Sequence, residues 1–79
     1  MAINVNDYPY GKISKTLRKA VKHLNIHGVH GCEFDYPTFG DLPRSIASRL
    51  SSDDVDFIQE NLHKVRGFQK SNCSWYKEV

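Results

Sequence analysis

The side chains best suited to metal binding in this sequence are four histidines and two cysteines. In chain order they are His23, His27, His30, Cys32, His63 and Cys73. Zinc takes four nitrogen or sulfur ligands in a tetrahedral arrangement, and His27, His30, Cys32 and Cys73 could supply such a set. Their spacing contains no C-x-x-C pair and follows no zinc-finger pattern. We therefore expect no metal site, ordinary surface histidines and free, buried cysteines.

Catalytic chemistry has equally little support. Cys32 or Cys73 beside a histidine could form a nucleophilic pair, but the sequence has no nucleophile elbow, no oxyanion motif and no third triad member. The glycines lack the order and the lysine of a phosphate-binding loop. The acidic cluster of Glu33, Asp35 and Asp41 does not have the spacing of a calcium loop. We expect a protein that is not an enzyme and needs no cofactor.

The length of 79 residues permits one domain, residues 1–79, and leaves no room for a second core. A chain of this size buries only about 60% of the surface of its unfolded state, so a deep substrate cavity would compete with stability. The composition, with 39% hydrophobic and 11% aromatic residues, is typical of a folded domain. Both observations favour a binding role.

Nothing in the sequence predicts a membrane contact or export. No stretch approaches the ~18 consecutive apolar residues of a membrane-spanning helix, and residues 1–12 lack the basic start and apolar stretch of a signal peptide. Two cysteines do not make a disulfide framework, and a reducing compartment would keep both thiols free. We expect a cytoplasmic protein; its oligomeric state is left open.

The net charge of +2 is the remainder of three unequal segments. Residues 1–30 hold five basic residues and one acidic residue, a net charge of +4. Residues 31–62 hold two basic and seven acidic residues, a net charge of −5, and residues 63–79 return to +3. A partner meets a local face rather than the average, so we expect basic and acidic faces to be used separately.

Residues 12–25 have the pattern of an amphipathic helix. Their apolar side chains recur at steps of three and four residues, at Ile13, Leu17, Ala20, Val21 and Leu24. The opposite face carries lysines, so the exposed side of this helix is basic. Asn25 and Gly28 tolerate the left-handed conformation that ends helices, and we expect the helix to stop there.

Two more helices are predicted in the acidic part of the chain. The first is predicted over residues 42–50, with Pro43 in its first turn, where proline is tolerated. Its expected buried residues are Leu42, Ile46, Ala47 and Leu50. The third helix begins after a cap at Ser51 or Ser52 and ends at Gly67. Its expected buried stripe is Val55, Ile58, Leu62 and Val65.

Extended structure is predicted in two places. Cys32, Phe34 and Tyr36 alternate on one side of a short strand after the first helix, which Pro37 would end. The tail, residues 68–79, has aromatic residues on both sides of a polar turn and suits a β-hairpin, with a frayed terminus as the alternative. Residues 1–10 read as an irregular lead-in whose Tyr8 and Tyr10 lie on the core.

The resulting fold class is α+β, mainly α. Helix, strand, helix, helix and hairpin, in this order over residues 12–79, resemble a winged-helix domain; a generic small helical or α+β domain is the alternative. The resemblance is carried by the run of residues 42–50, the Ser-Ser break, and Gly67-Phe68 leading into the wing. It implies that the third helix would enter a DNA major groove. Four carboxylates on that helix, Asp53, Asp54, Asp56 and Glu60, would be repelled there.

The basic residues outside the third helix are the better candidates for nucleic-acid contacts. A first helix lined with cations could meet phosphate, two arginines of the second helix could add contacts, and the tail could add aromatic stacking by Trp75 and Tyr76. The predicted nucleic-acid-binding residues are Lys12, Lys15, Arg18, Lys19, Lys22, Arg44, Arg49, Lys70 and Lys77. The function that we expect first is an accessory regulator that binds nucleic acid.

Two other hypotheses for the function stay open. In the first, the acidic third helix docks on a basic surface of a larger enzyme, as in an adaptor or an inhibitor of phage or mobile-element type. Its contact residues would be Asp54, Asp56, Phe57 and Glu60. In the second, Tyr36, Phe39 and Phe57 supply an apolar surface for self-association.

Overall fold

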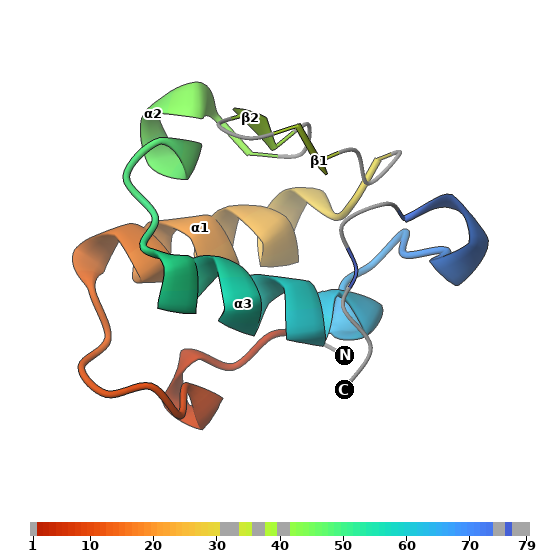
Figure 1. Cartoon of the computed structure of the whole chain (residues 1–79). Coiled ribbons are helices and arrows are strands. Elements are labelled where there is room, and N and C mark those ends of the chain that lie inside the picture. The colour runs from red at the N-terminus through yellow and green to blue at the C-terminus, as the bar shows by residue number, and fades with distance from the viewer. Residues whose placement is uncertain (1, 31–33, 36–37, 40–41, 74–75, 77–79) are drawn as a thin grey trace.

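A computed structural model describes residues 2–30, 34–35, 38–39, 42–73 and 76 of the chain (Figure 1). The described part contains three helices: α1 (Lys15–His27), α2 (Arg44–Ala47) and α3 (Ser52–Asn61). Short 3-10 turns lie at Val5–Asp7, Leu62–Lys64 and Lys70–Asn72. The protein is thus a small, mainly α domain with three helices.

Helix α1 forms where the periodicity predicts a helix. Ser14 caps its start, because the Ser14 hydroxyl accepts a hydrogen bond of 3.0 Å from the Leu17 amide. This cap leaves Lys12 before the helix, and the helix continues past Asn25 to His27. Gly28 ends it with a φ of 76°, and its amide donates to the Leu24 carbonyl at 2.8 Å. The face formed by Leu17, Ala20, Val21 and Leu24 is buried, as predicted.

The sequence predicts the start of α3 correctly and part of its buried face wrongly. Ser51 is the cap, and a capping box joins it to Asp54. Ile58, Leu62 and Val65 of the predicted stripe are buried, but Val55 is only half-buried. Asp54 and Phe57 are buried as well, with exposed fractions of 4% and 2%. The buried face of α3 therefore differs from the predicted one: it includes Asp54 and Phe57, which face the N-terminal segment.

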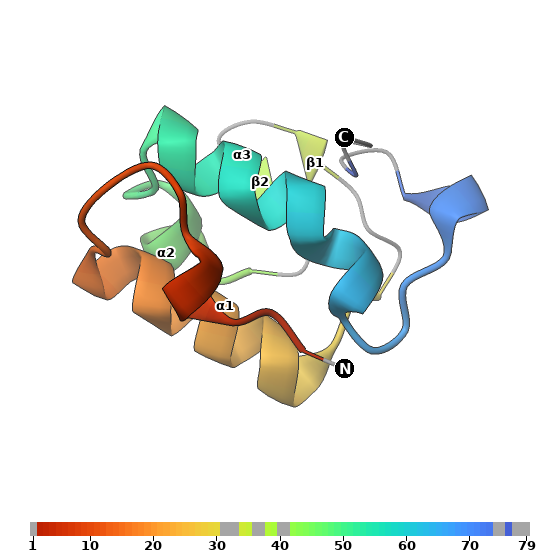
Figure 2. The ribbon, with the colours of Figure 1, turned by 90° about the horizontal axis from the view of Figure 1, so that it is seen from below.

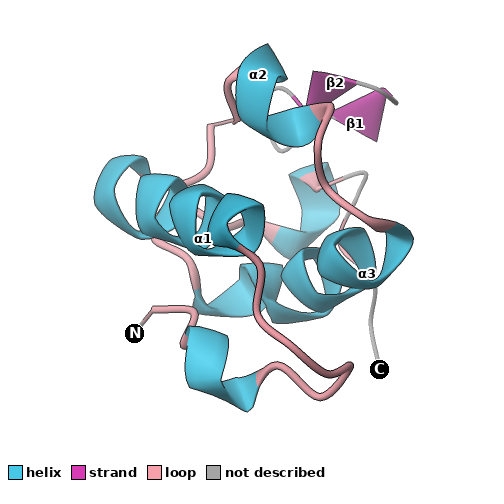
Figure 3. Cartoon of the chain, turned by 90° about the vertical axis from the view of Figure 1, so that its left-hand side faces the viewer, coloured by secondary structure: helices cyan, strands magenta, loops and turns pink. Residues whose placement is uncertain are grey.

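Helix α2 is shorter than the predicted helix over residues 42–50. Pro43 is its N-cap, and the helix ends at Ala47 because Ser48 and the residues after it form a turn. Leu42 and Ala47 are buried as expected, whereas Ile46 and Leu50 are half-buried. Helix α2 lies on one side of the α1–α3 pair and the N-terminal segment on the other (Figures 1 and 3).

The N-terminal segment crosses the α1–α3 pair and is fastened to it at several points (Figure 2). Ile3 is buried in the core, and its amide and carbonyl both bond the Asn25 side chain, each at 2.9 Å. The Tyr8 ring meets the Phe57 ring edge to face at 5.3 Å between centroids. Tyr10 is 41% exposed; its ring meets the Tyr8 ring edge to face at 5.6 Å between centroids, and its hydroxyl donates to Glu60. Tyr8 thus packs on the core as expected, and Tyr10 does not.

Two glycines allow the chain to cross itself beside the end of α1. The Val29 amide donates to the Arg66 carbonyl at 2.8 Å. A β-carbon on Gly67, whose φ is 85°, would lie 2.5 Å from the Val29 carbonyl oxygen. Gly28 is limited in the same way by the Arg66 carbonyl oxygen at 2.8 Å. Only glycine allows this close approach.

The β structure in the described residues is small. Phe34–Asp35 (β1) and Thr38–Phe39 (β2) pair antiparallel, with Phe34 opposite Phe39. The predicted strand over Cys32, Phe34 and Tyr36 is not confirmed beyond this pair, since residues 31–33 and 36–37 lie outside the described part. The predicted C-terminal hairpin is not confirmed either: Lys70–Asn72 forms a 3-10 turn, and residues 74–75 and 77–79 are not described.

Candidate nucleic-acid interface

Helix α1 presents four cations and no acidic residue. Lys15, Arg18, Lys19 and Lys22 are all exposed, and the helical repeat places them within one face, opposite the buried one. None of the four forms an ion pair with a described residue. We define these four residues as the basic face of α1. Their charges are free to attract an anionic partner.

A pocket of about 140 Å³ lies between α1 and α2. Its lining residues are Thr16, Lys19, Ser45, Ile46 and Arg49. Lys19 and Arg49 were predicted as phosphate contacts from two separate helices of the sequence, and the fold brings both to this one pocket. Among the described residues that line it, none is acidic. Ammonium, guanidinium and hydroxyl groups are all hydrogen-bond donors of the kind that oxyanions accept.

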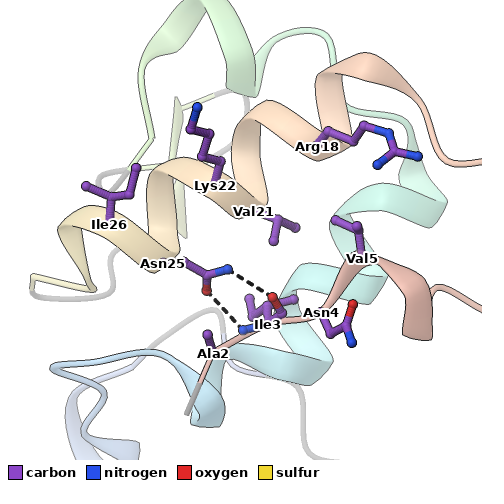
Figure 4. A pocket seen from close by; sticks show the side chains of 9 residues that line it. All are labelled: Ala2, Ile3, Asn4, Val5, Arg18, Val21, Lys22, Asn25 and Ile26. Atoms are coloured by element: carbon purple, nitrogen blue, oxygen red, sulfur yellow. Dashed lines mark hydrogen bonds between the residues drawn. The ribbon is translucent and has the colours of Figure 1, made fainter.

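Arg18 and Lys22 line a second, wider hollow on the other flank of α1 (Figure 4). This groove, of about 450 Å³, lies between α1 and residues 2–5. Its floor includes the apolar side chains of Val5 and Val21, and the exposed Ile26 lies at one end. The Arg18 guanidinium lies on the side of Val5, whereas the Lys22 ammonium points away from the N-terminal segment.

The other predicted contacts are spread over the molecule. Lys12 is exposed just before α1, and Arg44 is exposed on α2. Lys70 is exposed in the 3-10 turn that Figures 1 and 2 place at the opposite end of the molecule from α2. Lys77 lies outside the described residues, as does Trp75. The structure thus joins α1 and α2 into one basic surface and leaves Lys70 apart from it.

Sequence reasoning missed the two hydroxyls of the pocket. Thr16 lies three residues before Lys19 in α1, so its hydroxyl shares a helical face with that cation, and Ser45 lies four residues before Arg49, which is in the turn after α2. That spacing was the available signal. A third hollow, of about 500 Å³, is lined by Asn25, His63, Lys64, Val65 and Arg66 and was missed as well.

Of the four residues of the predicted acidic docking surface on α3, Asp54 and Phe57 are buried in this structure. The Asp54 Oδ2 atom accepts hydrogen bonds from the Ser51 amide at 3.3 Å and from the Ser14 hydroxyl at 3.4 Å. Asp54 therefore joins the starts of α1 and α3, and burial is possible because its oxygen is bonded.

The remaining two acidic candidates are Asp56 and Glu60, both half-buried. The Glu60 carboxylate accepts a hydrogen bond of 3.2 Å from the Tyr10 hydroxyl. At the start of α3, Ser14 and Tyr8 contact Asp54, whereas Ser51, Ser52 and Asp53 are exposed.

Tyr8 has the most perturbed acid–base equilibrium at this junction. Burial raises the pKa of its phenol from 10 to about 12, and the hydrogen bond to Asp54 and the charges of Asp54 and Asp53 act in the same direction. The folded state thus holds the phenolic proton more tightly than the unfolded state. The stability from this shift is fully present below about pH 10 and is lost as the pH rises toward 12.

We expect the Tyr8→Phe variant to lose less of its free energy of unfolding than the wild type between about pH 9 and about pH 11. Urea unfolding followed by circular dichroism at both pH values measures the difference. Tyr76→Phe is the control, since Tyr76 is also half-buried but contacts Phe68 and His63 rather than Asp54. Equal losses in the wild type and Tyr8→Phe would contradict the prediction.

The expectation of free cysteines is wrong for Cys73, which is disulfide-bonded. The chain has one other cysteine, Cys32, outside the described residues. A disulfide sulfur is no thiolate ligand, so Cys73 does not support the four-ligand zinc site considered above. Within the described ranges, no three histidine, cysteine or acidic side chains are grouped to hold a metal ion.

Comparison with protein-family models, with curated proteins and with solved structures finds no match for this chain. The part of the chain that the structure describes contains no helix with the length and apolar character to cross a bilayer. The functional assignment therefore depends on the interface itself.

Proposed function

We propose that this protein binds nucleic acid, without catalysing a reaction, through the basic face of α1 and the adjoining α2. One observation carries the proposal: Lys19 of α1 and Arg49 after α2 line the same pocket, and none of the described residues that line it is acidic. Phosphate is the anion that nucleic acid repeats along its length, and lysine and arginine are its usual partners.

The extent of the basic face suits a strand rather than a single small anion. Lys15 and Lys22 lie seven residues apart in α1, which is about 10 Å along the helix axis. One strand of duplex DNA carries a charge about every 3.4 Å of the duplex axis, so the face spans about three phosphates. Arg49 widens the contact surface toward α2.

In an ordinary winged-helix complex the third helix contacts DNA, whereas we propose that α1 does. Helix α3 exposes the carboxylate of Asp53 at its start, which would repel phosphate, so α1 is the helix that we place against the backbone. Contacts to phosphate position a protein but carry no sequence information. A domain that binds in this way acts as an accessory to other factors, and this is the regulatory role that we propose.

The test is the salt dependence of binding to a DNA duplex. With four or five phosphate contacts, the logarithm of the association constant should fall with the logarithm of the salt concentration at a slope of about −4. Fluorescence anisotropy between about 50 and about 200 mM salt measures this slope. Binding that is insensitive to salt, or no binding at the lowest salt concentration, would contradict the proposal.

A further inference from the structure

The pocket between α1 and α2 has a size that suits one phosphate group better than a whole nucleotide. Its volume is about 140 Å³, whereas pockets for larger organic ligands measure about 300–1,000 Å³. Four of the five lining side chains, from Thr16, Lys19, Ser45 and Arg49, can donate hydrogen bonds. The fifth, Ile46, is half-buried and forms an apolar wall.

The charge of the pocket distinguishes two kinds of phosphate. Lys19 and Arg49 bring two positive charges, and the other described residues of the lining, Thr16, Ser45 and Ile46, are uncharged. A phosphodiester inside a strand carries one negative charge, whereas a phosphate monoester carries about −1.5 to −2 at pH 7 and has three acceptor oxygens. Arginine can bond two of these oxygens at once, and lysine and the hydroxyls can bond the third. Charge and donor number both fit the monoester better.

We propose that this pocket binds the phosphate monoester at the end of a nucleic-acid strand. The inference rests on the proposed nucleic-acid function and names the chemical group that the α1–α2 surface recognises. The rest of the basic face, at Lys15 and Lys22, then follows the diester backbone that leads away from the end. The pocket thus favours strand ends over the interior of a duplex.

The experiment compares two short blunt DNA duplexes that differ only in a 5′-phosphate or a 5′-hydroxyl. Each duplex carries a fluorophore at a 3′ end, and anisotropy gives its affinity. Charge-assisted hydrogen bonds to one further group correspond to about tenfold in affinity. We therefore expect the wild type to bind the 5′-phosphorylated duplex about tenfold more tightly.

Variants separate the pocket from the surface around it. Lys19→Gln and Arg49→Gln should reduce the tenfold ratio to less than about twofold, since each removes a charged donor from the pocket. Lys15→Gln is the matched control: Lys15 belongs to the same face but does not line the pocket, so it should weaken both duplexes and keep the ratio. All three positions are exposed, and circular dichroism confirms that the variants fold.

The outcomes distinguish the two proposals. Equal affinity for the two duplexes would overturn the end-binding inference and leave the nucleic-acid function standing. A phosphate preference that survives in Lys19→Gln and Arg49→Gln would also overturn it. If neither duplex binds, the proposed function fails, and titration with inorganic phosphate tests the pocket alone. Saturable NMR shifts of the Thr16 and Ser45 amides that Arg49→Gln abolishes would support the pocket, and unchanged spectra would overturn it.

Discussion

Replacing Cys73 by serine is expected to lower the free energy of unfolding by about 3 kcal/mol. Cys73 is disulfide-bonded and packs against the core together with Phe68 and Tyr76. A disulfide restricts the unfolded chain, and its loss restores conformational freedom that folding must then overcome. Small domains have a stability of only about 5–15 kcal/mol, so this change is large. The tail after Gly67 should loosen first, because the disulfide-bonded Cys73 lies in it.

Urea unfolding of the oxidised wild type and of Cys73→Ser measures this loss. Ser71→Ala is the matched control, since Ser71 is exposed two residues away and its substitution should change stability by less than about 0.5 kcal/mol. Thiol titration adds an independent readout, because the folded wild type purified without reductant should show no reactive thiol. Two titratable thiols in that protein, or an unchanged stability of Cys73→Ser, would contradict the prediction.

Reversing three charges on α1 is expected to have the largest effect on binding. The triple variant Lys15→Glu, Lys19→Glu and Lys22→Glu should weaken DNA binding at low salt by about 100-fold or more, and the salt slope should fall by about three. Each substitution removes a phosphate contact and adds a repelling charge. The three side chains are exposed, so the fold should persist.

Two control variants test whether location or net charge causes the effect. Lys70→Glu reverses a cation at the far end of the molecule and should change affinity by less than about threefold. Asp53→Lys, on the exposed start of α3, should not weaken binding. If Lys70→Glu weakens binding as much as Lys19→Glu alone, the interface is not confined to α1 and α2.

Local patterns in the sequence predicted where the helices lie but not where each one ends: α2 ends at Ala47 rather than at residue 50, and α3 ends at Asn61 rather than at Gly67. The period of Leu17, Ala20, Val21 and Leu24 predicts α1 and its buried face, because that period is a property of consecutive residues. The Ser51 cap is equally local, since Ser51 and the Asp54 amide that it bonds are three residues apart. The end of α1 was predicted two residues early because Asn25 bonds Ile3 instead of ending the helix.

Features that depend on residues far apart in the sequence could not be predicted from local patterns. Asp54 is buried because Ser14, forty residues earlier, bonds its carboxylate, and no pattern within α3 signals that partner. Phe57 is inward because Tyr8 covers it. The number of cysteines suggested free thiols, but a pairing depends on where the tail docks.

In the candidate site, too, some features follow from local sequence patterns and others depend on tertiary contacts. The exposed cations of α1 follow from its period, so their availability was predictable. That Lys19 and Arg49 share one pocket depends on how α2 lies against α1, and this is a tertiary contact. The sequence also suggested that Lys70 belongs to the same surface, whereas the fold places it at the other end.

The most direct test of the proposed function is the affinity of the wild type and of the Lys15, Lys19 and Lys22 triple variant for one DNA duplex at about 50 mM salt. We predict saturable binding by the wild type that weakens steeply with salt, and a loss of about 100-fold or more in the folded triple variant. Equal binding by the two proteins, or no binding by the wild type, would contradict the assignment of α1 as a nucleic-acid-binding surface.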